Sequence, residues 1–464
     1  MSKHYVTALA LSGTLLACHG AWAQSSASSV ASAVSADTAQ LVKRGEYLAR
    51  AADCIACHTA KGGQPFAGGL PLETPIGKIY SSNITPDKGT GIGDYTLADF
   101  DKAVRHGVAK SGDTLYPAMP YPSYAKVAPS DINALYAYFM QGVKPVSQAN
   151  RAVDIPWPLS MRWPLATWRR LYAPAVVADD STMGMSVTNA SGGAPADPLA
   201  RGRYLVEGLG HCSACHTPRA VTMQEKSLTD DGSTFLSGGL IDGFLAKNLR
   251  SDVNDGLGSW SQQDIVSFLK GGRNGHSAAF GGMAEVVQDS TQYMSDSDLT
   301  AIAIYLKSLK PVNPGQTELT YDDTVAKQLR AGTNQSNGAM VFVNNCAACH
   351  RSTGSGYTET FPALALSSTV NTQDPSSLIH IVLTGAEMPW TRAAPTHYAM
   401  PGFAHRLSDQ DVADVLTFVR SSWGNKAPAV TAPMVAKGRA DYASDKAAVL
   451  TNNATTKQMS PLDK

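Results

Sequence analysis

The sequence predicts a mainly α-helical protein in which one helical plan occurs three times, with long linkers between the copies. Six of the seven cysteines form three pairs of identical spacing, and each pair ends a short helical pattern. Each copy then closes with a longer amphipathic helix. No stretch alternates apolar and polar residues as a half-buried strand does. A chain of 464 residues is long enough for about three domains.

The cysteine pairs share the pattern C-x-x-C-H, which is typical of covalent haem attachment. Each thiol adds to one haem vinyl group, and the histidine presents its imidazole to the iron. A redox dithiol has no use for a fixed following histidine, and zinc ribbons place their pairs only about 15–20 residues apart. We therefore predict three covalently bound haem c groups. Their predicted attachment points are Cys54, Cys57, Cys212, Cys215, Cys346 and Cys349, and their proximal iron ligands are His58, His216 and His350.

The start of the chain predicts export. Basic residues precede an apolar run, and Ala21-Trp22-Ala23 is typical of a signal-peptide cleavage site after Ala23. An alternative is cleavage before Cys18, which would leave that cysteine as a lipidated first residue. The apolar run is short for a membrane span, and no later stretch approaches about 20 apolar residues. We expect the protein on the periplasmic side of the bacterial inner membrane, where haem c is attached.

The three copies predict three class I-like cytochrome c domains, each with loops wrapped around its haem. Gly45, Gly202 and Gly338 occupy similar places ahead of the first cysteine, and the closing helices all begin with Ser-Asp, a favourable N-cap. The predicted segments are a signal peptide at 1–23, domains at 38–145, 197–312 and 333–424, linkers at 146–196 and 313–332, and a disordered tail at 425–464. Lysine plus arginine balance aspartate plus glutamate at 38 each, which disfavours a nucleic-acid partner.

A cytochrome c that only carries electrons usually has a methionine opposite the histidine, because the soft thioether raises the potential and blocks the site. Each copy offers one methionine in a loop before its closing helix: Met119, Met283 and Met400. These are the predicted distal iron ligands. Met294 competes with Met283, and Met388 competes with Met400. A histidine could replace a methionine, and the candidates are His106, His276, His397 and His405.

From about Leu41 to Asn425 the chain resembles the triheme cytochrome c subunit of bacterial membrane-bound periplasmic dehydrogenases. The resemblance is carried by "TPIGKIYSSNITPD", "YPAMPYPSYAK", "IPWPLSMRWPLATWRRLY" and "MPGFAHRLSDQDVADVLTFVRSSWGN". This family includes subunits of quinoprotein alcohol dehydrogenase and of flavin-dependent gluconate, sorbitol and fructose dehydrogenases. The resemblance implies a large partner subunit with pyrroloquinoline quinone or FAD, sometimes a small third subunit, and electron transfer to ubiquinone.

Two functions follow from different classes of protein. The first is an electron-transfer subunit, with no catalytic residue of its own. The alternative is a multihaem peroxidase-like enzyme, which needs one haem with an open sixth position; three available methionines disfavour it.

The stretch Ile155–Tyr172 combines three tryptophans and three arginines with apolar residues. Tryptophan and arginine suit the lipid headgroup region, so this stretch is a candidate for peripheral contact with the inner membrane. Its prolines disfavour an ideal amphipathic helix. The alternative is that the stretch packs against the first domain or against the dehydrogenase subunit.

Overall fold

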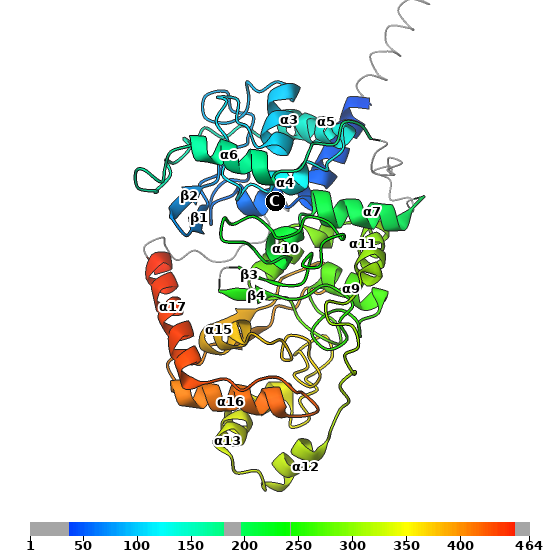
Figure 1. Cartoon of the computed structure of the whole chain (residues 1–464), viewed down its shortest axis with the longest axis vertical. Coiled ribbons are helices and arrows are strands. Elements are labelled where there is room, and N and C mark those ends of the chain that lie inside the picture. Colours follow the sequence, from blue (N-terminus) through cyan, green and yellow to red (C-terminus); the bar gives the residue numbers. More distant parts are fainter. Residues whose placement is uncertain (1–36, 181–195, 242, 451–464) are drawn as a thin grey trace, which may run out of the picture.

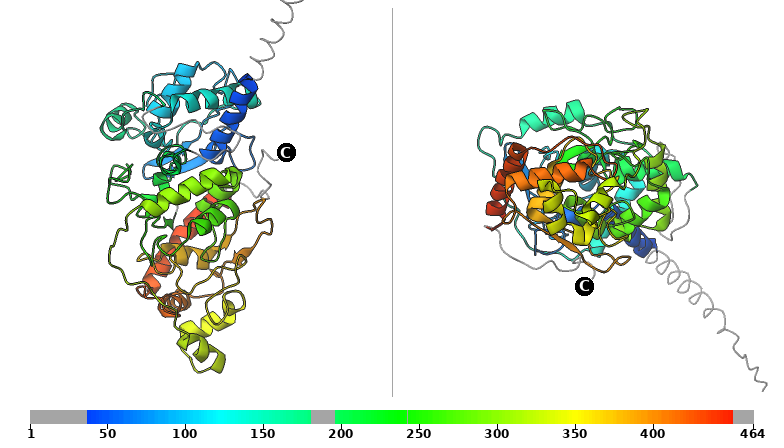
Figure 2. Two further views of the ribbon diagram at one scale, coloured as in Figure 1. Left: turned by 90° about the vertical axis from the view of Figure 1, so that its right-hand side faces the viewer. Right: turned by 90° about the horizontal axis from the view of Figure 1, so that it is seen from below.

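The computed structural model describes residues 37–180, 196–241 and 243–450, and it is helix-rich. Three units follow one another along the long axis of the molecule: unit 1 (residues 37–143), unit 2 (197–309) and unit 3 (335–425). Figure 1 shows unit 1 in blue and cyan at the top, unit 2 in green, and unit 3 in yellow and orange at the bottom. The side view in Figure 2 shows the same order.

The three units share an order of elements. Unit 1 contains a helix over 37–51, α2 (Cys54–Cys57), β1 (Pro71–Thr74), β2 (Gly77–Tyr80), α3 (Leu97–His106), α4 (Tyr121–Tyr124), α5 (Pro129–Ala137) and η1 (Tyr138–Gly142). Unit 2 contains α7 (Pro198–Tyr204), η2 (Leu205–Leu209), α8 (Ser213–His216), β3 (Gly239–Ile241), β4 (Phe244–Ala246), α9 (Gln262–Gly271), α10 (Gly282–Asp289), η3 (Thr291–Tyr293) and α11 (Asp296–Ser308). Unit 3 contains α13 (Asn337–Asn345), α14 (Ala347–His350), α15 (Ser376–Thr384), β5 (Gly385–Glu387), β6 (Ala399–Pro401) and α16 (Asp409–Ser421).

Local sequence explains where most helices begin. Ser295 and Ser408 cap α11 and α16, as predicted, by accepting a hydrogen bond from a backbone N–H in the first turn. The prediction of Ser130 as the cap of α5 is wrong. That helix begins at Pro129, whose fixed φ suits the first helical position, and the N–H of Ser130 donates to Oδ1 of Asp180 instead.

Glycine allows the first and last helices of each unit to cross closely. A Cβ atom on Gly45 would lie 1.9 Å from the carbonyl oxygen of Ala134, and one on Gly202 would lie 2.0 Å from that of Ala301. In unit 3, a Cβ on Gly338 would lie 2.4 Å from the carbonyl oxygen of Asp414. No other residue fits at these positions, which explains why all three copies carry glycine there.

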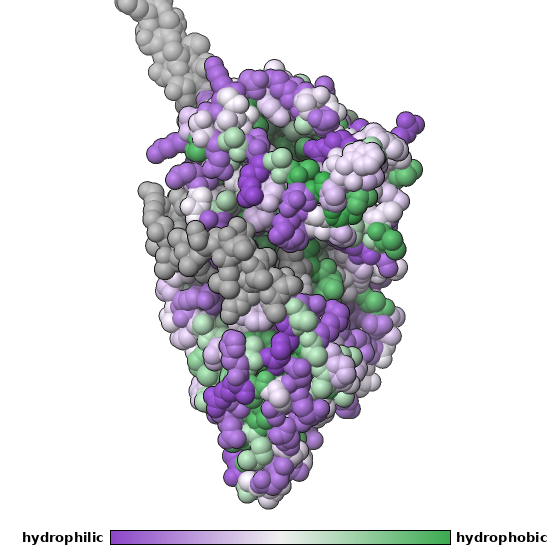
Figure 3. All heavy atoms as spheres, turned by 90° about the vertical axis from the view of Figure 1, so that its left-hand side faces the viewer, coloured by the Kyte–Doolittle hydropathy of each residue, from purple (hydrophilic) through white to green (hydrophobic). Residues whose placement is uncertain are grey.

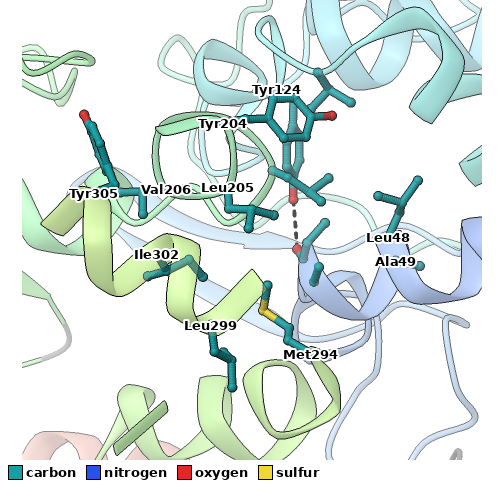
Figure 4. Close-up of a cluster of buried hydrophobic side chains, with 14 of the residues drawn as sticks. Leu48, Ala49, Tyr124, Tyr204, Leu205, Val206, Met294, Leu299, Ile302 and Tyr305 are labelled. Carbon is teal, nitrogen blue, oxygen red and sulfur yellow. Dashed lines mark hydrogen bonds between the residues drawn. The ribbon is translucent and has the colours of Figure 1, made fainter. Parts of the chain in front are cut away.

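Units 1 and 2 share one apolar core, whereas unit 3 has its own. Figure 4 shows Leu48 and Ala49 of the first helix in the same buried cluster as Tyr204 and Leu205 of unit 2 and Met294, which precedes α11. The long first linker therefore does not hold these two units apart. Burial of the facing apolar surfaces joins them directly.

The prediction of a mainly helical protein did not include the few short strands that the structure contains. Each unit has one short antiparallel hairpin, with β1 paired to β2, β3 to β4 and β5 to β6 in the described residues. In unit 3 the hairpin pairs Ala386 with Met400. The strands are too short, at three or four residues, to produce a detectable alternating pattern.

The linkers are partly structured. In the first one, the backbone of Asp154 pairs with that of Lys78 in β2, and α6 (Trp163–Tyr172) then runs across unit 1. The second contains α12 (Thr324–Ala331). Residues 181–195, in the second half of the first linker, lie outside the described residues.

The prediction of a disordered tail from residue 425 is wrong for its described part. Helix α17 (Ala432–Leu450) packs against α15 and α16. Val435 is fully buried in the core of unit 3, and Nε of Arg439 donates to Oδ1 of Asp409 at 2.7 Å. This apolar contact offsets the cost of ordering the chain, which composition alone did not reveal. Residues 451–464, the predicted signal peptide with its predicted cleavage site after Ala23, and Cys18 lie outside the described residues.

Within the described ranges, no helix is both long enough and apolar enough to cross a bilayer.

Candidate haem-attachment sites

The three motif histidines are held in the same way. Nδ1 of His58 lies 2.7 Å from the carbonyl oxygen of Ser82, Nδ1 of His216 lies 2.8 Å from that of Lys247, and Nδ1 of His350 lies 3.0 Å from that of Pro362. Because the carbonyl accepts a hydrogen bond, Nδ1 carries the proton and Nε2 keeps its lone pair. Metal-bound histidines are commonly oriented in this manner.

Burial keeps these imidazoles neutral. It lowers the pKa of all three histidines, and the pKa of His216 falls to about 4. A neutral imidazole is the form that ligates iron.

Backbone hydrogen bonds fold the chain back onto each histidine. The carbonyl of His58 accepts from the N–H of Gly68 at 2.8 Å, and that of His216 accepts from Gly238 at the same distance. In unit 3 the carbonyl of His350 accepts from Gly356 at 3.2 Å. Gly68 has a φ of +72°, and a Cβ there would lie 2.4 Å from the carbonyl carbon of Ser82. The glycine therefore lets the loop reach the carbonyl group that orients His58.

The six motif cysteines form no disulfide bond with one another. Burial raises the pKa of Cys54 and of Cys212 to about 12 and that of Cys346 to about 11. A redox-active dithiol needs a lowered thiol pKa, so these sites do not resemble one. The described residues also contain no cluster of three or more His, Cys, Asp or Glu side chains that would hold a metal ion.

The three predicted methionines are half-buried and lie in different local structures. Met119 sits in a turn just before α4, where its carbonyl accepts from the N–H of Tyr121 at 2.8 Å. Met283 lies in the first turn of α10, and Met400 lies in β6. Met119 borders the same core as Cys54, and Met400 borders the same core as Cys346.

The competing residues have other contacts. Met294 is buried in the core shared by units 1 and 2. The sulfur of Met388 accepts a hydrogen bond from Nη1 of Arg273 at 3.8 Å. His276 stacks on Trp260 with ring centroids 5.2 Å apart. His106 and His397 lie within 4.0 Å of carboxylates on their own units.

The sites of units 1 and 2 face each other. Helix α10, which carries Met283, lies against α2 of unit 1, and α4, which follows Met119, lies against η2 of unit 2. Cys57 and Cys215 are close enough that Cys215 adds to the effect of burial and of Asp53 in raising the pKa of Cys57 to about 12.

Sequence reasoning missed the groups that orient the histidines and join the units. The acceptors on Ser82, Lys247 and Pro362 are backbone carbonyls, which every residue has, so no side-chain pattern marks them. Tyr47 and Tyr204 each bond to a residue of the other unit. The sequence does mark these two residues, because both follow an Arg-Gly pair at the same position of the repeat.

These residues fit haem c. The thiols form no disulfides, the imidazoles are neutral with Nε2 available, and the half-buried thioethers of Met119 and Met400 border the same cores as Cys54 and Cys346. A helix-rich fold with such sites defines a c-type cytochrome, which holds haem by covalent bonds. Consistent with this, the family model for cytochrome c matches residues 335–423.

Similar proteins identify the family. The chain is 61% identical over 407 residues to the gluconate 2-dehydrogenase cytochrome c subunit of Pantoea cypripedii, covering 86% of this chain and 90% of the relative. It is 53% identical over 408 residues to the alcohol dehydrogenase (quinone) cytochrome c subunit of Gluconacetobacter polyoxogenes, covering 87% and 85%. It is 37% identical over 423 residues to the fructose dehydrogenase cytochrome subunit of Gluconobacter japonicus, covering 86% and 82%. The chain belongs to the family of dehydrogenase cytochrome c subunits that includes those of gluconate 2-dehydrogenase and quinone alcohol dehydrogenase.

Proposed function

We propose that this chain carries three haems c and passes electrons from the catalytic subunit of a periplasmic dehydrogenase to ubiquinone. The catalytic subunit would oxidise an alcohol, a sugar acid or a polyol with pyrroloquinoline quinone or FAD, and a small third subunit would complete some of these complexes. The signal peptide would direct the chain to the periplasmic side of the inner membrane, with peripheral contact to the bilayer.

The observation that carries this proposal is the threefold repetition of an anchored histidine beside a C-x-x-C pair. The cysteine pairs at positions 54 and 57, 212 and 215, and 346 and 349 would form the thioether bonds. Met119, Met283 and Met400 would complete the iron coordination of the three units and exclude other ligands. Haem c supplies reversible one-electron chemistry when bound, and the chain's own role is to hold and insulate it.

The protein also contributes a rigid spacing between the first two sites. A buried ion pair crosses from unit 1 to unit 2, with Nζ of Lys126 lying 2.7 Å from Oε2 of Glu207. Tyr305 donates a further hydrogen bond to the same carboxylate. The rate of electron transfer falls steeply with the distance between two haems. A fixed joint between the units would therefore hold that rate steady.

Haem counting tests the proposal. Mass spectrometry of the denatured mature protein should show three covalent haems, and a variant with Cys212→Ala and Cys215→Ala should show two. The complex with its dehydrogenase subunit should reduce a ubiquinone analogue when substrate is added. An unchanged haem count in the variant would overturn the three-site assignment. High-spin absorption and cyanide binding in the wild-type protein would favour the peroxidase-like alternative.

A further inference from the structure

An exposed apolar surface lies over unit 1, on the segment between the first two units. Its members, here called the tryptophan surface, are Trp157, Leu159, Trp163 and Leu171 of this segment, together with Val221 of unit 2. The side chains of Trp157, Trp163 and Leu171 are 81%, 69% and 68% exposed, and that of Val221 is fully exposed. Figure 3 shows green and near-white spheres gathered on the upper right of this face, over unit 1 and α6.

The backbone beneath this surface is ordered by specific contacts. Ile155 is buried, and its neighbour Asp154 pairs with Lys78 through two backbone hydrogen bonds. The guanidinium of Arg162 stacks on Tyr116, 4.3 Å from the ring centroid. The exposed tryptophans are therefore held outward by a fixed framework and are not part of a loose linker.

Trp168 has a different role from the other two tryptophans. Its Nε1 donates to the carbonyl oxygen of Thr222 at 2.7 Å, and its ring meets Tyr121 edge-on, with centroids 6.3 Å apart. It fastens α6 to units 1 and 2 and brings Val221 beside the helix. The packing alternative predicted from the sequence thus describes Trp168, while Trp157 and Trp163 have their rings in solvent.

The segment that carries most of the tryptophan surface is rich in cations. Between residues 143 and 178 the sequence has five cations and a single acidic residue, Asp154. Of these cations, Lys144, Arg151 and Arg170 are exposed. Exposed tryptophan and leucine suit the boundary between headgroups and acyl chains, and surrounding cations attract anionic headgroups. A surface that binds an acidic protein would need the cations but not the exposed tryptophan and leucine side chains. The combination therefore favours a lipid partner.

We propose that the tryptophan surface is the face that enters the headgroup region of an anionic bilayer, with Trp157 and Trp163 inserted. This inference rests on the proposed delivery of electrons to ubiquinone, and it adds where the protein meets the lipid. Arg162 and Trp168 stack on Tyr116 and Tyr121, which flank Met119 in the sequence. Met119, the predicted distal ligand of unit 1, therefore lies in a segment that packs directly beneath this surface.

Vesicle sedimentation of the full-length holocytochrome tests the proposal. We expect binding to vesicles that contain phosphatidylglycerol, and weaker binding to pure phosphatidylcholine. The double variant Trp157→Ser and Trp163→Ser should lose at least about tenfold in affinity, because two large side chains no longer leave water. Arg170→Gln should weaken binding mainly at low salt.

The matched control is Met340→Ser with Val343→Ser on α13 of unit 3, where both side chains are 39–44% exposed. These changes should leave vesicle binding unchanged. All variants should keep the wild-type haem spectrum, and the tryptophan variant should still co-purify with the dehydrogenase subunit.

Three results would overturn the proposal: no binding by the wild-type protein, undiminished binding by the tryptophan variant, or equal loss in the control. Undiminished binding together with loss of the dehydrogenase subunit would assign the surface to the subunit interface instead. If the wild-type complex binds vesicles through this surface but does not reduce ubiquinone, the surface stands and the assignment of the electron acceptor fails.

Discussion

The hydroxyl of Tyr204 in unit 2 donates a 2.6 Å hydrogen bond to Oδ2 of Asp131 in unit 1. The reverse bond also exists: Tyr47 of unit 1 donates to Oδ2 of Asp298 in unit 2, again at 2.6 Å. Both carboxylates are buried, and each is also paired with an arginine of its own unit, Arg44 or Arg201. Each unit thus donates a hydrogen bond from the equivalent tyrosine to the equivalent aspartate of the other unit, so the contact between them is close to twofold symmetric. Repetition of one sequence plan supplies both halves of this contact.

Removing one of these hydroxyls should loosen the joint. Tyr204→Phe leaves a buried carboxylate with one bond fewer, and a hydrogen bond to a charged group contributes about 1.5–3 kcal/mol. We expect the denaturant midpoint of the holoprotein to fall, with its haem spectrum unchanged. Tyr357→Phe, at an exposed position in unit 3, is the control and should have no effect. Equal midpoints for the two variants would show that the joint contributes no stability.

Close crossing of helices in unit 2 should depend on Gly202. In Gly202→Ala, the added methyl would lie 2.0 Å from the carbonyl oxygen of Ala301 and 2.7 Å from Cβ of Tyr305, so α7 must move away from α11. Overpacking of this kind lowers the free energy of unfolding by about 1–3 kcal/mol. Thermal unfolding of the variant would measure this loss. Gly275→Ala is the matched control, because no atom lies within 4 Å of its new methyl. A control variant as unstable as Gly202→Ala would contradict this explanation.

Distal ligation can be tested one site at a time. Replacing Met119, Met283 or Met400 by Ala should weaken the sulfur–iron absorption band, lower the potential of one haem and open it to carbon monoxide. Met388→Ala should change none of these, because the Met388 sulfur contacts Arg273. A variant that keeps three low-spin His/Met signals would remove that methionine from the ligand set. Loss of the band in Met388→Ala would exchange the roles of Met388 and Met400.

The start of α16 should contribute stability that depends on pH. Hydrogen bonds from Ser408 and then from Asn337 lower the pKa of Asp411, so the folded state favours the ionised carboxylate. Its contribution is present above the unfolded pKa of about 3.9 and is lost as pH falls through the lower folded value. Asp411→Ala should therefore lower the unfolding midpoint at neutral pH, and the difference from wild type should shrink towards about pH 3. Ser421→Ala, at the other end of α16, removes a hydroxyl that donates only to backbone carbonyls, and it should give a difference that does not vary over this range.

The sequence alone was sufficient for the chemistry and for the helical plan. The motifs ending at His58, His216 and His350 predict haem because covalent attachment fixes the spacing of the two thiols and the histidine. The N-caps at Ser295 and Ser408 are equally local, since a cap contacts only its own first turn. Such features depend only on residues that are close together along the chain, so they can be predicted from a sequence pattern.

Only the tertiary structure decided how the parts meet. Ser82, Lys247 and Pro362 orient the histidines through backbone carbonyls, which leave no mark on the sequence. The composition of the tail indicated disorder, yet burial of Val435 and the bond from Arg439 to Asp409 order its first part. The tryptophans at 157, 163 and 168 look alike in the sequence, but Trp168 is packed and the other two are exposed. In each case the deciding partner is far away along the chain, so its contribution exists only once burial has brought the segments together.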